Sequence, residues 1–462
     1  MGLPSETHRV KGVICLFLLI ASVVLAQGGY NDDRIMIQGF MWESHQEGTH
    51  TAPGNNSYTV HWKKKWYEHV KSKIDEIADA DFDLIWLPPP SQGEGAGYHP
   101  QELYNFDNNY GTLAQHQNLL LALKAKGIEP IADIVINHRN GTGGWSTFRN
   151  PDWPVRYICT TDEFWQQDPD TNNSLSQEDK DILRNDLRGG ADYQTYCETN
   201  WSGARDLDHT NPDLRNEIKQ YLQKLKDFGY NGWRYDYVKG FDPVYIAEYN
   251  YDSQPTFAVG EYWDENPNAI TEWIDKTKMQ GQPDPALHAC SAFDFATQKY
   301  LREFIGHEAY TDLRAVTFQD GLWDGLIAIN SNKAVTFLEN HDTGFPQKQF
   351  DSFSNDDKLM QAYAFILTHP GLPCVYWKHY FEWNRGSEIK ALMRARKKAG
   401  IHSGSFIKTE AHGRDYVAIV GDRPTDSSTL IVKIGPDMSF QPDMNVWKLE
   451  TSGHRYAVWI RR

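Results

Sequence analysis

Short apolar runs alternate with longer amphipathic stretches along most of the chain. A continuous apolar run bounded by turn residues predicts a buried strand, whereas apolar residues at helical spacing predict a helix. The predicted strands are RIMIQGF (34–40), LIWLPPP (84–90), IADIVIN (131–137), GWRYDYV (232–238), TFAVGEYW (256–263), SAFDFA (291–296), AVTFLEN (334–340) and PCVYW (373–377). The helical patterns between them include KKWYEHVKSKIDEIADA, QHQNLLLALKAKG, NPDLRNEIKQYLQKLKDFG and DDKLMQAYAFILTHPG. Eight strand–helix units in succession predict a parallel (β/α)8 barrel, with an open doubly wound sheet as the alternative.

One connection is too long for a loop within a compact barrel. Residues 139–207 are rich in Asp, Asn, Gly and Trp and show little periodicity, which favours a small inserted domain. After residue 400 the pattern changes to alternating, turn-bounded runs such as DYVAIVGD, STLIVKIG and RYAVWIRR, which predict an antiparallel sheet. We therefore expect an α/β protein with a barrel built from residues 27–138 and 208–400, an inserted domain at 139–207 and a C-terminal β-sheet domain at 401–462.

The first 26 residues have the pattern of a targeting segment. Arg9 and Lys11 precede the apolar run GVICLFLLIASVVLA, which is too short to span a bilayer comfortably, and Val24 and Ala26 are small residues at a plausible cleavage point. We interpret residues 1–26 as a signal peptide, and an uncleaved anchor is the alternative. The protein is then expected to be secreted, extracellular and free of the membrane.

Secretion permits disulfides. Cys159 and Cys197 share one loop-rich segment, where the sequence is compatible either with a disulfide or with two thiols. Cys290 and Cys374 lie in apolar, strand-like runs and are expected to be buried thiols.

Composition narrows the class of partner. The formal net charge of −16 argues against nucleic acid and anionic membranes and is compatible with a neutral substrate. Aromatic residues make up 13% of the chain, including 16 Trp, and their flat faces either stack on sugars or fill cores.

Polar side chains follow several predicted strands. In a parallel barrel the C-terminal ends of the strands surround one pocket. The polar residues at these ends are Asp133, Asn137, His138, Arg234, Asp236, Glu261, His341 and Asp342, and the loop GYHP adds Tyr98. Carboxylates grouped in this way would repel one another at a cost that a structural role does not explain. Arg234 with Asp236, taken alone, is also compatible with a buried, self-satisfied ion pair.

Paired carboxylates without a nucleotide motif or a thiolate favour glycoside cleavage. One carboxylate attacks the anomeric carbon, and a second, kept protonated, gives a proton to the leaving oxygen. Arg234 can hold Asp236 ionised and oriented as the nucleophile. His138 and His341 are suited to hydrogen bonds with sugar hydroxyls.

Eight stretches together carry a resemblance to a known family. They are IQGFMWES, WLPPPSQ, DIVINHR, DLDHTNP, GWRYDYVKG, VGEYWD, FLENHDTG and GLPCVYW. In this order they resemble the blocks of the α-amylase family of retaining glycoside hydrolases, closest to plant-type α-amylases. The resemblance covers the chain from about Ile35 to its C-terminus and is weakest in 139–205.

The resemblance implies a set of site residues. Asp236 would be the nucleophile, Glu261 the general acid/base and Asp342 the transition-state stabiliser. The residues implied around the sugar are Tyr98, His138, Arg234 and His341, with Lys239 on the leaving-group side. The resemblance also implies Ca²⁺, bound by Asn137, Asp192, Asp206 and the backbone carbonyl of Gly240, although Asn137 and Asp206 also fit capping or turn positions.

The function expected from these residues is that of a secreted, calcium-dependent endo-acting α-amylase. It would cleave internal α-1,4 bonds of starch, glycogen or malto-oligosaccharides with retention of configuration, as a monomer. One alternative is an α-glucosidase or transglycosylase of the same fold. Another is a glycan-binding homologue without activity, which the presence of all three carboxylates argues against.

Overall fold

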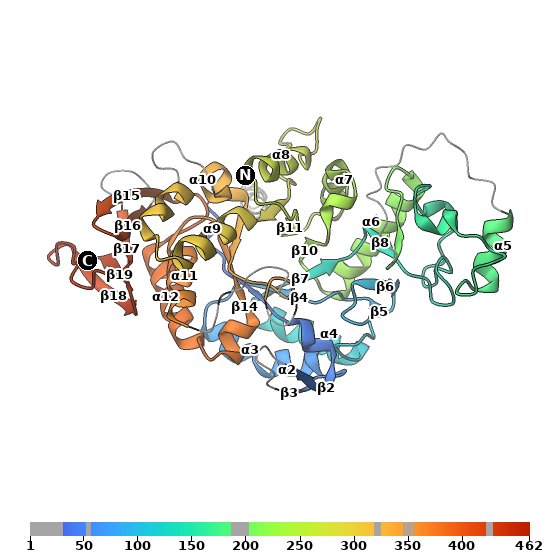
Figure 1. Cartoon of the computed structure of the whole chain (residues 1–462), viewed down its shortest axis with the longest axis horizontal. Coiled ribbons are helices and arrows are strands. Elements are labelled where there is room, and N and C mark those ends of the chain that lie inside the picture. The colour runs from blue at the N-terminus through green and yellow to red at the C-terminus, as the bar shows by residue number, and fades with distance from the viewer. Residues whose placement is uncertain are drawn as a thin grey trace, which may run out of the picture.

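A closed barrel of eight parallel strands forms the centre of the molecule (Figure 1). The computed structural model describes residues 31–51, 57–185, 203–317, 325–344, 347, 353, 356–421 and 428–462. Around the barrel the strands follow the order β1-β14-β13-β12-β11-β10-β7-β4. Their bounds are Met36–Gln38 (β1), Leu84–Leu87 (β4), Glu129–Ile134 (β7), Gly232–Tyr235 (β10), Ala258–Gly260 (β11), Ser291–Phe293 (β12), Ala334–Phe337 (β13) and Leu372–Tyr376 (β14). The predicted (β/α)8 barrel is confirmed, and the open sheet is excluded.

Helices between the strands surround the barrel. They are α2 (Trp66–Ser72), α3 (Ile74–Asp79), α4 (Leu113–Ala125), α6 (Pro212–Phe228), α7 (Pro243–Ser253), α8 (Pro267–Lys276), α9 (Phe295–Gly306), α10 (Leu326–Asn330), α11 (Asp357–Thr368) and α12 (Gly386–Ala399). Local sequence sets their ends, as α6 illustrates. Asn211 accepts a hydrogen bond from the amide of Asp213, Pro212 occupies the first turn, and Gly229 ends the helix at a φ of 125°.

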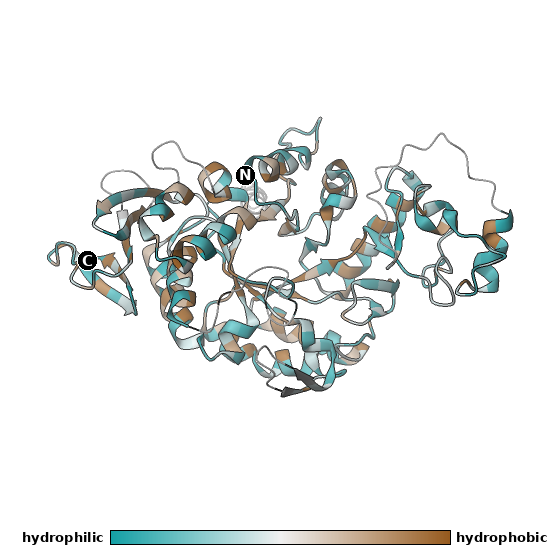
Figure 2. Cartoon of the chain, viewed as in Figure 1, coloured by the Kyte–Doolittle hydropathy of each residue, from teal (hydrophilic) through white to brown (hydrophobic). Residues whose placement is uncertain are grey.

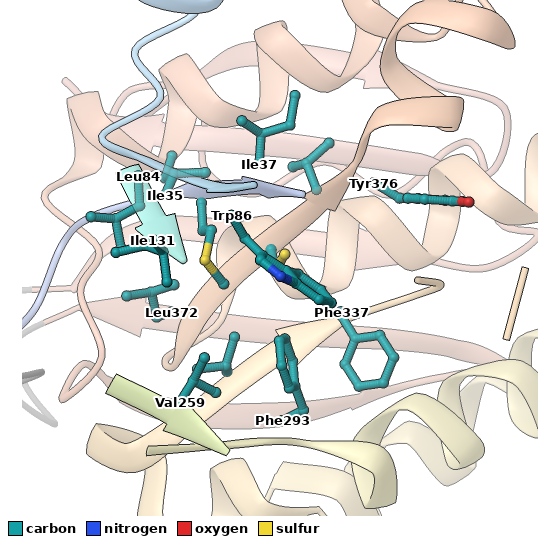
Figure 3. Close-up of a cluster of buried hydrophobic side chains, with 14 of the residues drawn as sticks. Ile35, Ile37, Leu84, Trp86, Ile131, Val259, Phe293, Phe337, Leu372 and Tyr376 are labelled. Atoms are coloured by element: carbon teal, nitrogen blue, oxygen red, sulfur yellow. The ribbon is translucent and has the colours of Figure 1, made fainter. Parts of the chain in front are cut away.

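Apolar side chains fill the barrel and the layer between strands and helices. Figure 2 shows hydrophobic residues concentrated on the central strands, with hydrophilic residues more frequent on the surrounding helices and loops. In Figure 3, Trp86 lies among side chains from several strands. The rings of Trp86 and Phe293 are 5.4 Å apart, and Phe337 meets Phe293 edge to face at 5.5 Å. This close packing gives the strand ends a rigid base.

Several strands are shorter than their apolar runs predicted. The run at 232–238 forms a strand only to Tyr235, and Tyr237 has left-handed backbone angles (φ 42°). The predicted strand is therefore too long at its C-terminal end, and Tyr237 and Val238 lie beyond it. The run at 131–137 likewise ends as a barrel strand at Ile134. In both places the strand ends earlier than predicted, and the polar residues Asn137 and Asp236 lie just beyond its end.

A long excursion leaves the barrel after β7 and returns before α6. Its ends pair as a short antiparallel ribbon of β8 (His138–Arg139) and β9 (Arg205–Asp206), with His138 opposite Asp206. The described part also contains α5 (Gln177–Asn185), which lies at one extreme of the molecule in Figure 1. Residues 186–202 lie outside the described part.

Smaller ribbons flank the mouth, and a separate sheet ends the chain. The ribbons are β2 (Glu47–Thr51) with β3 (Ser57–His61) and β5 (Gln92–Glu94) with β6 (His99–Glu102). The C-terminal antiparallel sheet has the order β15-β16-β17-β19-β18, with bounds Phe406–His412, Asp415–Gly421, Ser428–Ile434, Tyr456–Arg461 and Trp447–Gly453. Tyr416 of β16 joins it to the barrel layer, because its hydroxyl lies 2.6 Å from Nε2 of His369 after α11. The predicted C-terminal sheet is confirmed, while the exact domain boundaries stay a prediction.

None of the helices in the described part of the chain combines the length and the apolar character needed to cross a bilayer. The proposed signal peptide lies outside the described residues.

Candidate active site

The guanidinium of Arg234 lies at the centre of a group of carboxylates. Its Nη1 donates to Oδ1 of Asp133 at 2.8 Å and to Oδ1 of Asp236 at 2.7 Å, and its Nη2 lies 2.5 Å from Oε1 of Glu261. Its Cζ lies 4.8 Å from the ring centroid of Trp86, and the side chain is fully buried. One cation facing three acids leaves a surplus of carboxyl groups, so at least one must be protonated or face a cationic partner. Arg234 and Asp236 therefore do not form an isolated ion pair.

Asp133 supports this arrangement from within β7. Its Oδ2 accepts hydrogen bonds from Nε1 of Trp86 at 3.0 Å and from the hydroxyl of Tyr98 at 2.8 Å. Burial raises its pKa to about 6, against the opposing effect of Arg234. Its oxygens are occupied by protein donors, so we interpret Asp133 as a group that orients Arg234 and Tyr98. The sequence signal for it was one acid inside an otherwise apolar strand.

Asp236 lies on the turn directly after β10. Its amide donates to the carbonyl of Ile134 at 3.0 Å, which continues the pairing with β7 for one residue. The chain then turns sharply at Tyr237. Arg234 holds the carboxylate of Asp236. The residue is 7% exposed, so solvent or a ligand can reach it.

Glu261 follows β11 and faces the same point. Its amide donates to the carbonyl of Tyr235 at 2.9 Å, and its Oε2 accepts from the amide of Tyr237 at 3.2 Å. Burial raises the pKa of Glu261 well above its usual value; Arg234 opposes this, and the charges of Asp236 and Asp342 add to it. Burial therefore favours the protonated form of Glu261, as a proton donor requires, although its Oε1 also contacts Arg234.

Asp342 is held by a turn after β13. Oδ1 of Asn340 accepts from the amides of Asp342 and Thr343 at 3.0 and 2.9 Å, and Oγ1 of Thr343 accepts from the amide of Asn340 at 2.9 Å. Burial raises the pKa of Asp342 to about 7; Arg234 opposes the shift and Asp236 adds to it. This group therefore changes charge near neutral pH.

His341 lies beside Asp342 and is almost fully buried. Its Nε2 lies 3.3 Å from Oδ2 of Asp342, and its Nδ1 accepts a hydrogen bond from Nε2 of Gln38 at 3.0 Å. Burial, and after it the charge of Arg234, lowers the pKa of His341 well below its usual value. The imidazole is therefore neutral.

Three flat rings lie nearly parallel at the mouth. Tyr98 and His341 stack at 5.0 Å with 11° between their planes. The ring of Trp42 is 6.2 Å from each, inclined by 4° to Tyr98 and 10° to His341. Trp42 and Tyr98 are only partly buried, so they present apolar ring surface of the kind that packs against a sugar. Trp42 was missed as a site residue, although the block IQGFMWES contains it.

His138 and Lys239 contact different neighbours near the carboxylate group. Nε2 of His138 is 2.7 Å from the carbonyl of Tyr98, which ties the inserted segment to the loop that carries this ring. Burial lowers the pKa of His138. Nζ of Lys239 donates to Oδ2 of Asp264 at 3.0 Å and lies 4.8 Å from the ring of Tyr262. The side chain of Lys239 is 30% exposed, and the acid that it pairs with is Asp264 rather than Asp236 or Glu261.

Residues with side-chain oxygens lie where the inserted segment joins the barrel. Asn137 precedes β8, Asp206 ends β9, and both are buried. A Cβ on Gly240 would lie 1.8 Å from Oδ1 of Asn137, so the amide fits only against a glycine. An amide oxygen, a carboxylate and a nearby backbone carbonyl are the donors that Ca²⁺ prefers, so these residues fit the ion. Asp192 lies outside the described residues.

The structure describes Cys159, Cys290 and Cys374. Cys290 and Cys374 are free and buried, which confirms that prediction. Cys159 takes part in a disulfide, and its proposed partner Cys197 lies outside the described residues.

Family models match two parts of the chain. Residues 67–382 match the model described as the alpha amylase catalytic domain, and residues 398–460 match the alpha-amylase C-terminal beta-sheet domain. The chain is 32% identical to Probable alpha-amylase 2 of Arabidopsis thaliana over 92% of this chain and 93% of that protein. It is 31% identical to Alpha-amylase 3, chloroplastic, of the same plant, over 95% of this chain and 45% of that longer protein.

Solved structures agree in fold. An alpha-amylase from Malbranchea cinnamomea superposes with a TM-score of 0.60 at 17% identity, over 93% of this chain and 96% of that one. A cyclic alpha-maltosyl-(1→6)-maltose hydrolase from Arthrobacter globiformis in complex with maltose gives 0.60 at 14% identity, over 93% and 99%. The family match covers most of the barrel and the terminal sheet, and the chain therefore belongs to the alpha-amylase family of glycoside hydrolases.

Proposed function

We propose that the protein is an endo-acting α-amylase that hydrolyses internal α-1,4 bonds of starch, glycogen or malto-oligosaccharides with retention of configuration. The observation that carries this proposal is the unequal state of two neighbouring acids. Arg234 contacts both Asp236 and Glu261, and burial raises the pKa of Glu261, which favours its protonated form. Retaining cleavage needs this combination of an ionised nucleophile and a proton donor.

The residues divide the work as follows. The carboxylate of Asp236 attacks the anomeric carbon while Glu261 gives its proton to the leaving glycosidic oxygen. Glu261, then ionised, takes a proton from the water that releases the sugar from Asp236. Asp342 in its ionised form stabilises the positive charge that develops on the ring.

The surrounding groups hold the sugar. Tyr98 would stack on the ring being cleaved, and Trp42 would extend this apolar surface. His138 and His341 would hydrogen-bond sugar hydroxyls, and Lys239 would contact the sugar that leaves. Arg234 would hold the carboxylate of Asp236 in its orientation throughout.

A bound Ca²⁺ is part of the proposal. Asn137, Asp206 and the carbonyl of Gly240 would hold it, together with Asp192 from the undescribed segment. The ion would supply structural cross-linking, because its ligands come from the inserted segment and from the turn after Asp236. The chain's own residues perform the chemistry.

We further propose that residues 1–26 direct secretion, and that the mature protein acts as a monomer without a nucleic-acid or membrane partner. The net charge of −16 supports the absence of polyanionic partners. N-terminal sequencing of protein collected from the culture medium tests secretion and cleavage after Ala26. Retention inside the cell with an intact leader contradicts it.

The test of the activity is a reducing-sugar and product-size assay on soluble starch. An endo-acting enzyme shortens long chains early and releases mixed oligosaccharides. Glucose as the sole early product indicates an α-glucosidase, and products longer than the substrate indicate a transglycosylase. Binding without turnover indicates a glycan-binding module. Asp236→Asn serves as the inactive control.

A further inference from the structure

Gln38 is a buried polar residue at the end of β1. Its backbone is in register with Trp86 of β4 and Tyr376 of β14, so its position in the barrel wall is fixed. The side chain is fully buried, and its Nε2 donates to Nδ1 of His341 at 3.0 Å. A buried carboxamide has a desolvation cost, which this bond offsets in part.

This bond determines where the imidazole of His341 carries its proton. A neutral imidazole has one N–H, and a nitrogen that accepts from Gln38 cannot also be protonated. The proton is then on Nε2. That atom makes no hydrogen bond within the described residues, although it is buried and lies 3.3 Å from Oδ2 of Asp342. It is a buried donor beside Asp342 that is not used by the described residues.

The opposite orientation of the Gln38 amide is disfavoured by charge. Its Oε1 would then face Nδ1 and require an N–H there. The lone pair of Nε2 would point toward the carboxylate of Asp342, which is repulsive once that group is ionised. The donor at one end of the ring and the acid at the other therefore select the same tautomer.

Ring contacts leave the imidazole little freedom to rotate. His341 stacks on Tyr98 at 5.0 Å, packs against Phe40 at 5.0 Å, and lies 6.2 Å from the parallel ring of Trp42. With the ring plane fixed by these contacts and Nδ1 placed against Gln38, the tautomer decides which nitrogen is the donor.

We propose that Gln38 is a positioning residue that holds His341 in the Nε2–H tautomer, so that the imidazole presents its N–H beside Asp342 and can donate it to a hydroxyl of a bound sugar. The part that concerns the sugar rests on the proposed function. The part that concerns the tautomer is a property of the free protein and is tested without substrate.

A carboxylate at position 38 separates this role from simple packing. The charged or dipolar groups facing His341 are Asp342, Arg234, the hydroxyl-bearing ring of Tyr98 and Gln38 itself. In Gln38→Glu, the new carboxylate accepts from Nδ1–H. At low pH the imidazolium has both N–H groups and keeps its donor on Nε2. As the pH rises the ring keeps a single proton, and the introduced carboxylate at Nδ1 then competes for it with Asp342 at Nε2, so that part of the Nε2–H donor is lost.

The first experiment is nitrogen NMR of histidine-labelled wild-type protein, with His341→Gln to assign the signal. Long-range proton–nitrogen correlations identify the protonated ring nitrogen. We expect Nε2–H for wild type. An Nδ1–H signal overturns the proposal, whether or not the protein hydrolyses starch. A correct tautomer with no starch hydrolysis overturns the proposed function instead.

The second experiment compares kinetics of Gln38→Leu, Gln38→Glu and Gln361→Leu. Gln361 is an equally buried glutamine on α11 and controls for loss of a carboxamide. We expect Gln38→Leu to lose about tenfold in kcat/KM, mostly in kcat, as fits one hydrogen bond that tightens in the transition state. Gln38→Glu should lose activity with rising pH where wild type does not. Unchanged kinetics and pH profile in both Gln38 variants overturn the proposal.

Discussion

Nη1 of Arg234 lies 2.7 Å from Oδ1 of Asp236, and the same atom lies 2.8 Å from Asp133. The nitrogen that holds the proposed nucleophile is itself held by an acid of the neighbouring strand. Two adjacent strands, in register at Arg234 and Asp133, therefore fix the direction of the Asp236 carboxylate.

Replacing each proposed acid by its amide should abolish most activity. Asp236→Asn removes the nucleophile, Glu261→Gln the proton donor, and Asp342→Asn a transition-state charge. Each variant should lose at least about 10³-fold in kcat on starch, since covalent and acid–base contributions are each of that order. Asp213→Asn, an exposed acid on α6, should stay close to wild type. A folded variant that keeps a tenth of wild-type activity contradicts the role assigned to its residue.

The first product should be the α-anomer. A covalent intermediate on Asp236 involves two inversions, so the original configuration returns. Proton NMR of a short, fast hydrolysis reads the anomer before it equilibrates. An early β-anomer would show a single displacement by water and remove Asp236 from the role of nucleophile.

Asp342 should reduce stability at neutral and alkaline pH. Folding raises its pKa from 3.8 to about 7, so the folded state favours the protonated acid. Its favourable contribution is complete below the unfolded pKa and is lost as the pH rises through about 7. Asp342→Asn cannot ionise, so at about pH 8 it should unfold a few degrees above wild type, with a smaller difference at about pH 5. Thermal unfolding measures this, and a variant less stable than wild type at the higher pH contradicts it.

Calcium removal should lower both stability and activity. A ligand that binds only the folded state stabilises it by RT ln(1 + [L]/Kd), about 2.7 kcal/mol at a hundredfold excess over Kd. Treatment with EDTA should lower the unfolding temperature, and returning Ca²⁺ should restore it, with Mg²⁺ a poor substitute because it demands a tighter octahedral shell. Asp206→Ala should reproduce much of the loss with Ca²⁺ present, and Asp213→Ala should not. If the chelator changes neither the unfolding temperature nor the activity, and elemental analysis finds no calcium, the proposed Ca²⁺ site is wrong.

Gly240→Ala should act through Asn137. The added methyl would lie 1.8 Å from Oδ1 of Asn137, so the amide must move away from Gly240. We expect a lower unfolding temperature and weaker Ca²⁺ binding by calorimetry. Gly306→Ala is the matched control, since a Cβ there meets nothing within 4 Å. Equal behaviour of the two variants would show that the close approach at Gly240 has no consequence.

The sequence correctly predicted which segments form the barrel strands, but it predicted the ends of these strands less accurately. Apolar runs mark burial, and both Tyr235 and Val238 are buried, so the run continues past the last barrel hydrogen bonds. The residue at which strand pairing stops depends on the neighbouring strand, and the local sequence pattern holds no information about that neighbour. The left-handed turn at Tyr237 has no local signal of glycine or asparagine type.

In the candidate site, too, some features could be predicted from local sequence and others could not. Asp236, Glu261 and Asp342 could be named because each follows an apolar run in a recognisable block. Gln38 could not be assigned a role, because its partner His341 is 303 positions away and a lone glutamine in an apolar strand has several explanations. Pairings of this kind depend on how the barrel closes.

The ribbon of β8 and β9 has a consequence for how the protein can change. His138 and Asp206 face one another, so the excursion leaves and re-enters the barrel at one place. A segment whose two ends already meet can be lengthened, shortened or exchanged without pulling the barrel strands apart. The barrel can therefore accept a different insertion at this place. The place adjoins His138, whose Nε2 lies 2.7 Å from the carbonyl of Tyr98. Variation in the excursion can therefore alter the surroundings of Tyr98 while Asp236 and Glu261 stay in place.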